Sequence, residues 1–481
     1  MRKISKYLIL LAVVLLVSCG KQEAKYVFMF IGDGMGPVHV NAAERYLSSL
    51  KNQSGIIKLN LNKAEHTGAA TTYSKNKYIT DSAAAGTALS SGQKTSNGTL
   101  CMNAEHTKSF KTIAQSAKEK GMKVGILTSV DIAHATPASF YAHQASRGNY
   151  YEIGKELIHS DFDFFGGGEL RRKLDPNGID SVNLVDLAKE NAYLFINNPT
   201  AFAFLEPGAG KVLFEHPEVA NDHAMPYDMD LSEDGISLAD LTEKAIMMLD
   251  NEAGFFMMVE GGKIDWASHR HDAAAVIKDI VAFDEAVKVA LDFYEDHKEN
   301  TLIVITADHE CGGMTLGTAG GEYEMDLAKL QWQTKSFKFI TEEYYTLKKE
   351  LELIMGRDSM LLDSAWAFSF IYDKTSLGDE SKGLGLDSAD IADLTKAYKR
   401  SFEPRDRSNH AEYILYGSHD PFLIHTSHLL SRKAGIGWNT YSHTGVPVPV
   451  RAFGFESEQF DGYYDNTDIY KKLVSIMNLQ Q

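Results

Sequence analysis

The sequence has no excess of basic residues. Its 481 residues include 48 Lys and Arg against 65 Asp and Glu, which gives a formal net charge of −17. Proteins that bind nucleic acids generally present a basic face to the phosphates, so we expect no nucleic-acid partner. The acidic balance does not exclude an anionic substrate, because bound metal cations reverse the sign of the charge locally.

An apolar run of membrane-spanning length is also missing from the N-terminus, where YLILLAVVLLV has only 11 residues. After the basic segment MRKISK, a run of this length is typical of a signal peptide. It leads to Leu16-Val17-Ser18-Cys19, which resembles a bacterial lipoprotein cleavage box. We therefore predict a signal peptide at 1–18, a short tether at 19–25, and a lipid on Cys19 that holds the exported protein at a membrane, in the periplasm or on the cell surface. The alternative is an ordinary signal peptide with a chance cysteine.

Cysteine is scarce as well, with three residues in the chain. With a lipid on Cys19, only Cys101 and Cys311 remain. In an oxidising compartment these two thiols can form a disulfide, but a single candidate pair does not decide whether they do.

Short apolar segments, each closed by a turn or a charged group, predict five buried strands. They are Tyr26–Ile31, Lys123–Thr128, Gly254–Val259, Leu302–Thr306 and Val448–Phe453. Amphipathic helical patterns lie between them, for example at Phe110–Lys120, Leu238–Leu249 and Ala273–Tyr294. This alternation is typical of an α/β fold, and we predict a three-layer sandwich with a central, mostly parallel sheet and helices on both faces. The domain would span 26–481, with a helical insertion at about 320–416 that caps or flanks the functional site.

Polar side chains follow four of these strands. In chain order they are Asp33, then Asp131, His134 and Thr136, then Glu260, then Asp308 and His309. In parallel sheets, ligands bind beyond the carboxyl ends of the strands, so we expect these side chains to converge.

Two pairs of acidic and histidine residues near these strand ends have a spacing that suits the binding of one metal ion. Asp265 and His269 are four residues apart, which places both on one helix face, and Asp308 and His309 are adjacent at a turn. Each pair taken alone is more often a solvated surface or a polar strand cap. Their convergence with the other polar strand ends is what favours a metal site.

Ser82 begins the small-residue run SAAAGTA, which predicts a helix. A helix N-terminus binds anions, so Ser82 would stand at a place where an anion can bind. The alternative is that Asp81 or Ser82 simply caps the helix. No G-x-S-x-G elbow surrounds Ser82, and GDGMGP lacks the spacing of a G-x-G-x-x-G nucleotide loop, so neither motif is predicted.

Six motifs, in order along the chain, resemble those of the alkaline phosphatase family: GDGMG, TDSAAAGTA, HATPASFYAHQASR, VEGGKIDWASH, TADHE and SHTG. The resemblance covers most of 26–315 and 430–455 and fades across the predicted insertion. It implies metal-dependent hydrolysis of small phosphate monoesters through a phosphoserine, two Zn²⁺ and one Mg²⁺, and a homodimer.

The resemblance also assigns roles to individual residues. Ser82 matches the nucleophile, and Arg147 matches the arginine that clamps the phosphate. The ligands of the first zinc match Asp265, His269 and His443, those of the second zinc match Asp33, Asp308 and His309, and those of the third metal match Asp33, Thr136 and Glu260. The donor chemistry agrees, because imidazole and carboxylate suit zinc and hard oxygens suit magnesium.

Two positions depart from the best-known enterobacterial pattern. Position 134 is His instead of Asp, and position 266 is Trp instead of a Lys near the phosphate. We expect His134 to influence the third metal indirectly, through contacts with the metal's ligands. Its imidazole would make Zn²⁺ or Co²⁺ competitive with Mg²⁺ at this site. Because Trp266 is uncharged, it cannot supply the positive charge that a lysine at this position would bring to the phosphate.

Two other functions stay open from the sequence. One is a phosphodiesterase of the same superfamily, if the insertion reshapes the pocket. The other is a surface lipoprotein that binds metal or phosphate without turnover, against which the intact nucleophile, arginine and ligand set argue.

Overall fold

The computed structural model describes residues 23–480, except 220, 320 and 407. The predicted signal peptide and Cys19 lie outside these residues. Across the described part of the chain, no helix is long and apolar enough to cross a membrane.

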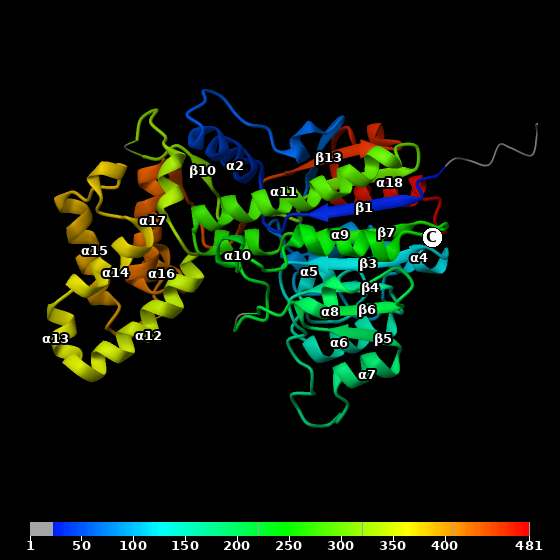
Figure 1. Cartoon of the computed structure of the whole chain (residues 1–481), viewed down its shortest axis with the longest axis horizontal. Helices are drawn as coiled ribbons and strands as arrows, with labels where there is room; N and C mark the ends of the chain where they lie inside the picture. Colours follow the sequence, from blue (N-terminus) through cyan, green and yellow to red (C-terminus); the bar gives the residue numbers. More distant parts are fainter. Residues whose placement is uncertain (1–22, 220, 320, 407, 481) are drawn as a thin grey trace, which may run out of the picture.

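A ten-stranded sheet forms the centre of the molecule, in the order β14-β2-β13-β8-β1-β7-β3-β4-β6-β5 (Figure 1). Its strands are β1 Tyr26–Ile31, β2 His66–Thr71, β3 Lys123–Thr128, β4 Phe164–Gly167, β5 Tyr193–Ile196, β6 Lys211–Glu215, β7 Phe255–Glu260, β8 Thr301–Thr306, β13 Val448–Gly454 and β14 Gly462–Asp465. All neighbours pair in parallel except β13, which is antiparallel to both β8 and β2. The central strands are apolar and buried on both faces, as a parallel sheet between helix layers requires.

The register of the central strands brings their carboxyl ends level. Ile31 of β1 pairs with Glu260 of β7 on one side and with Thr306 of β8 on the other. The segments that carry Asp33, Glu260 and Asp308 therefore leave the sheet at one edge.

Helices cover both faces of the sheet (Figure 1). In one layer α11 packs against α9 and α2, and in the other α3 packs against α4, α5 and α18. The helices outside the lobe described below are α2 Pro37–Leu50, α3 Ser82–Ser91, α4 Ile113–Glu119, α5 Ala135–Ala138, α6 Tyr150–His159, α7 Leu184–Glu190, α8 Pro199–Ala203, α9 Leu238–Leu249, α10 Lys263–His269, α11 Ala273–Asp296 and α18 Asn466–Ile476. The predicted three-layer α/β sandwich is confirmed.

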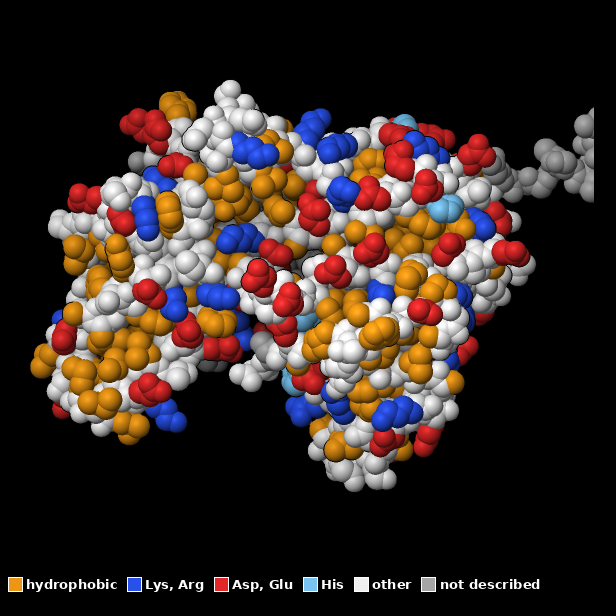
Figure 2. Space-filling model, in the orientation of Figure 1, with side chains coloured by type: hydrophobic (Ala, Val, Ile, Leu, Met, Phe, Trp, Pro, Cys, Tyr) orange, Lys and Arg blue, Asp and Glu red, His pale blue; other side chains and the backbone are white. Residues whose placement is uncertain are grey.

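A helical lobe stands beside the sandwich, at the left of Figure 1. It consists of α12 Phe337–Met355, α13 Arg357–Leu362, α14 Ala365–Thr375, α15 Ser388–Arg400, α16 His410–Tyr416 and α17 Pro421–Ala434. The lobe continues beyond the predicted boundary at 416, because α15 packs against α17. Figure 2 shows hydrophobic side chains gathered over α12 and α13 at its free end, where Leu353 and Leu362 are 83% and 87% exposed.

Four short strands complete the edge of the sheet that carries the polar residues. They are β9 Glu310–Cys311, β10 Thr315–Leu316, β11 Ile436–Gly437 and β12 His443–Thr444. In the antiparallel pair β9–β12, His443 lies opposite Cys311. This pairing brings His443 to the carboxyl end of β8, although the two segments are far apart in sequence.

Candidate active site

The first donor group joins α10 to the short strand β12. Nε2 of His269 lies 3.2 Å from one carboxylate oxygen of Asp265, and Nε2 of His443 lies 3.6 Å from the other. The opposite ring nitrogens face backbone carbonyls, of Tyr441 at 2.6 Å from His269 and of Thr80 at 2.8 Å from His443. Nδ1 of each ring therefore donates, and Nε2 is left as the atom that can hold a metal.

The second donor group lies at the ends of β1 and β8. Nε2 of His309 lies 3.2 Å from Oδ2 of Asp308 and 3.5 Å from Oδ1 of Asp33. Oδ1 of Asp308 accepts from the backbone N–H groups of Gly34 and His309, at 3.1 and 2.9 Å. Gly34 has φ +70°, and a Cβ there would lie 2.9 Å from the Cα of Asp265, so only glycine lets the two donor groups approach.

The third donor group differs in part from the predicted one. Glu260, Asp33 and a ring nitrogen of His134 lie within 4.8 Å of one another. Thr136 donates a hydrogen bond to Oδ2 of Asp33 at 3.2 Å, and Thr128 donates to Glu260. His134 is therefore one of the potential metal donors, whereas we expected it to contact only the ligands of the metal.

Four buried carboxylates with unpartnered oxygens meet in this space. Within the described residues, Asp33 Oδ1, Glu260 Oε1, Asp265 Oδ1 and Asp308 Oδ2 have no hydrogen-bond partner. Buried carboxylates without partners are costly, so this concentration of them fits bound cations. The residues present therefore suit the metals that the sequence implies.

Burial raises the pKa values of three of these four carboxyls, which favours their uncharged forms. It raises the pKa of Glu260 to about 7 and that of Asp308 to about 8, and it holds the pKa of Asp33 well above its usual range. Asp265 is the exception: burial opposes its charge, but His269 and His443 beside it hold its pKa well below the usual range. Without cations, the site therefore favours protonation of three of its four carboxyls.

Ser82 is the first residue of α3 and is 2% exposed. Its Oγ lies 3.3 Å from Nε2 of His309. Asp81 is the N-cap of the helix, because its Oδ1 accepts from the N–H of Ala84 at 3.0 Å. Capping by Asp81 leaves the hydroxyl of Ser82 free to face the second donor group.

Arg147 reaches the same space from the loop before α6. One of its nitrogens lies 3.1 Å from Oδ2 of Asp81, and another donates to Nε2 of His134 at 2.9 Å. The ring of Trp266 stands 5.7 Å from that of His134, edge to face. All the predicted site residues thus lie at one edge of the sheet.

Cys311 and Thr128 were missed from the sequence. The sulfur of Cys311 belongs to the donor group of Asp265, His269 and His443, and Cys311 stands two residues after His309, a spacing that pointed to it. Thr128 had no motif to mark it. Cys101 and Cys311 are both buried free thiols, so the structure contains no disulfide between them.

Comparison with known proteins identifies this arrangement. The profile of the alkaline phosphatase family matches residues 24–479. "Alkaline phosphatase 3" of Bacillus subtilis is 31% identical over 467 residues, which cover 95% of this chain and 90% of that protein.

Two solved structures are also similar. A cold-active alkaline phosphatase from a psychrophilic Shewanella superposes with a TM-score of 0.75 and 28% identity, covering 94% of this chain and 99% of that one. The Thermus thermophilus alkaline phosphatase, at 22% identity and a TM-score of 0.76, covers 96% of this chain and 93% of its own, and shares the fold. The chain therefore belongs to the alkaline phosphatase family and is a metal-binding enzyme that hydrolyses phosphate monoesters.

Proposed function

We propose that this enzyme hydrolyses small phosphate monoesters through a phosphoserine at Ser82, with two Zn²⁺ and a third divalent cation. The observation that carries the proposal is the 3.3 Å between Ser82 Oγ and His309 Nε2, beside buried carboxylates that lack partners. The zinc ligands would be Asp265, His269 and His443 for the first ion and Asp33, Asp308 and His309 for the second. When bound, these ions would supply the charge that activates the serine and stabilises the leaving oxygen.

The side chains around the ions orient the substrate. Ser82 opens α3, so the phosphate would lie against the positive end of that helix. The guanidinium of Arg147, steadied by Asp81, would bind two phosphate oxygens with its planar fork. His443 and His269 are held in orientation by the carbonyls of Thr80 and Tyr441.

The third cation would be bound by Asp33, Thr136 and Glu260. Oxygen donors favour Mg²⁺, and a variant of an Antarctic bacterial alkaline phosphatase, 25% identical with a TM-score of 0.63, has Mg bound at a metal site. The ring of His134 adds a softer donor, which makes Zn²⁺ or Co²⁺ competitive there.

Trapping the covalent intermediate tests the proposal. The zinc-loaded enzyme is incubated with p-nitrophenyl phosphate, quenched in acid and digested, and the phosphorylated peptide is mapped by mass spectrometry. We expect phosphate on Ser82. Phosphate on another residue, or no monoesterase activity at full zinc content, would overturn it, and faster turnover of bis(p-nitrophenyl) phosphate would favour the diesterase.

We also propose that the protein is exported, carries a lipid on Cys19 and forms a homodimer. The support is the cleavage box at 16–19 and the relationship to other bacterial alkaline phosphatases. The description of 320–416 as an insertion within the catalytic domain belongs to the same proposal.

A further inference from the structure

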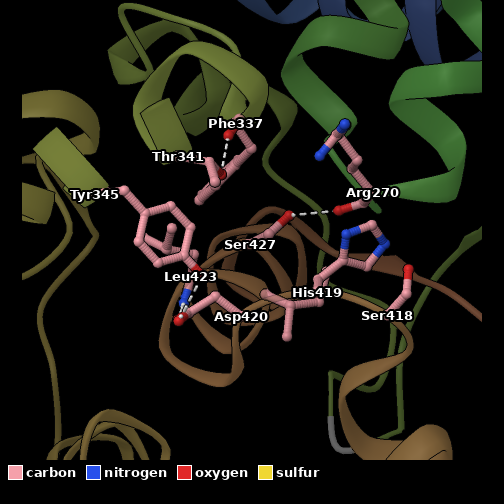
Figure 3. Close-up of a pocket in the computed structure, with 10 residues that line it drawn as sticks. Arg270, Phe337, Thr341, Tyr345, Ser418, His419, Asp420, Leu423 and Ser427 are labelled. Atoms are coloured by element: carbon pink, nitrogen blue, oxygen red, sulfur yellow. Dashed lines mark hydrogen bonds between the residues drawn. The ribbon is translucent and has the colours of Figure 1, made fainter. Parts of the chain in front are cut away.

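A cavity of about 170 Å³ lies between the lobe and the segment that follows α10. Figure 3 shows Thr341 and Tyr345 of α12 on one side of it, with Arg270 and His419 on the other. Asp420, the N-cap of α17, lies between them. The cavity is therefore built jointly by the sandwich and the lobe.

Arg270 brings an unneutralised positive charge to this cavity. Its backbone is held, because the N–H donates to the carbonyl of Ala267 and its own carbonyl accepts from Ser427 at 3.4 Å. Its guanidinium makes no hydrogen bond or ion pair with any residue that the structure describes. The backbone is thus fixed while five N–H donors remain available.

The carboxylate in the cavity does not neutralise Arg270, because other donors already surround it. Oδ1 of Asp420 accepts from Ser401 Oγ at 2.8 Å and from the N–H of Phe422 at 2.9 Å. Its Oδ2 accepts from the hydroxyl of Tyr345 at 3.1 Å. The cavity is left with the charge of Arg270 as its main unpaired electrostatic feature.

The cavity is linked through Arg270 and His419 to His269, the residue beside which we expect a product alcohol to leave. Ser82 faces His309 in the second donor group, so in an in-line displacement the leaving oxygen points toward the first group, at His269. Arg270 directly follows His269 in the chain. Nε2 of His419 donates to the carbonyl of His269 at 3.0 Å, which ties the lobe wall to the same residue.

We infer that this cavity binds an anionic group carried by the leaving alcohol, with Arg270 as its ligand. The inference rests on the proposed function. The preferred substrates are then phosphate monoesters whose alcohol carries a carboxylate or a second phosphate. A guanidinium binds either group with two parallel hydrogen bonds, and the surrounding hydroxyls of Thr341 and Ser418 suit a hydroxylated substrate.

Two substrate pairs that differ by one anionic group test this. The first pair is 3-phosphoglycerate and glycerol 3-phosphate, and the second is fructose 1,6-bisphosphate and fructose 6-phosphate. The measured quantity is the ratio of kcat/KM within each pair, in metal-loaded wild type, Arg270→Gln and Arg270→Lys. Lys51→Gln is the control, because it removes one positive charge from an exposed residue after α2.

Arg270→Gln should lower the ratio roughly tenfold in at least one pair, because a hydrogen-bonded charged contact is lost. Arg270→Lys should retain part of the preference, and Lys51→Gln should keep the wild-type ratio. A fall in the first pair assigns the cavity to carboxylates, and a fall in the second assigns it to phosphates.

Equal ratios in wild type and Arg270→Gln for both pairs would overturn the inference, as would an equal fall in Lys51→Gln. Failure of the proposed function would look different, since wild type would then not turn over even glycerol 3-phosphate. Equal metal content and thermal midpoint in wild type, Arg270→Gln and Arg270→Lys would show that both variants are folded. Arg270→Lys then separates the charge, which it keeps, from the planar fork, which it loses.

Discussion

At the scale of single residues, the site depends on which groups have hydrogen-bond partners and which do not. The metal-facing oxygens of the four acidic residues have none, whereas the outward nitrogens of His269 and His443 are held by backbone carbonyls. Bound cations and substrate would supply partners for the carboxylate oxygens, whereas the protein itself supplies partners for the outward histidine nitrogens. Substitutions at these positions therefore separate chemistry from metal binding.

Ser82→Ala should lower kcat on the order of a thousandfold or more, because the nucleophile is lost while electrostatic stabilisation remains. Zinc content should stay near that of wild type, since the imidazole and carboxylate donors of both zinc groups remain in the variant. Steady-state kinetics and metal analysis of the same preparation check both parts. A variant that lost its zinc along with its activity would contradict this separation.

His134→Asp should raise the affinity for Mg²⁺ by roughly 10–100-fold, because a carboxylate replaces a ring nitrogen beside Asp33 and Glu260. The measurement is a titration of metal-stripped wild type and variant with Mg²⁺, Zn²⁺ and Co²⁺. Trp266→Phe is a matched control, because it changes the aromatic neighbour of His134 without adding a charge. Identical Mg²⁺ titrations for wild type and His134→Asp would show that position 134 does not tune the metal.

At the scale of elements, helix α3 shows how the site is held in place. Asp81 accepts from Ala84 with one oxygen and from Gly98, at 3.0 Å, with the other, which also pairs with Arg147 at 3.1 Å. One residue thus starts the helix that carries Ser82 and steadies the arginine. Removing the cap and removing the charge are separable changes.

Asp81→Ala should destabilise the protein by about 1 kcal/mol, the usual cost of losing an N-cap. Asp81→Asn keeps an oxygen for the cap, so it should recover most of this stability. Both variants should bind product phosphate differently from wild type, because Arg147 loses its charged partner. Urea unfolding of wild type and both variants measures the loss of the cap, and phosphate inhibition constants measure the effect on Arg147. Equal stabilities of the Ala and Asn variants would argue against the cap.

At the scale of the whole molecule, the metal site joins elements from nearly the full length of the chain. Its carboxylates come from β7, from α10 and from the segments that directly follow β1 and β8, so their repulsion acts between distant parts of the chain. Metal binding should therefore govern the stability of the entire fold. A cation present at 100 times its dissociation constant would stabilise the folded state by about 2.7 kcal/mol.

The metal-stripped protein should become less stable as the pH rises. In the folded state burial raises the pKa of Glu260 to about 7 and of Asp308 to about 8, whereas the unfolded carboxyls titrate near pH 4. Their contribution is therefore fully present below about pH 4 and is lost as the pH rises through about 7 and 8. Thermal melts at pH 5 and pH 8.5 should show a larger fall for the stripped protein than for the zinc- and magnesium-loaded one. Equal falls would mean that these carboxyls do not control stability.

Membrane attachment is a property of the full chain, and Cys19 is its predicted anchor. Cys19→Ser should move the protein from the membrane fraction to the soluble exported fraction, because the lipid cannot be attached. Cys101→Ser is the control, because the Cys101 thiol is buried inside the folded domain and cannot carry the lipid. Fractionation and immunoblotting check the outcome; a Cys19→Ser protein that still sediments with membranes would refute the lipid anchor.

The sequence by itself determined the fold class and most of the site. The bounds of β1 and β3 were predicted to the residue, because each contains a short apolar run that is followed by a polar turn. The ordered motifs identified the family and named the donors. The short strands β4 and β14 were missed because FFGG and GYYD have no apolar run long enough to mark a strand.

The tertiary structure decided what depends on contacts between distant segments. The direction of β13, the pairing that brings His443 opposite Cys311, and the place of His134 among the donors all follow from packing. So does the cavity at Arg270, whose walls come from α12 and α17 more than sixty residues further along the chain. Local patterns specify strands, helices and ligand types, whereas distances between them are set only when the apolar faces of the whole chain are buried together.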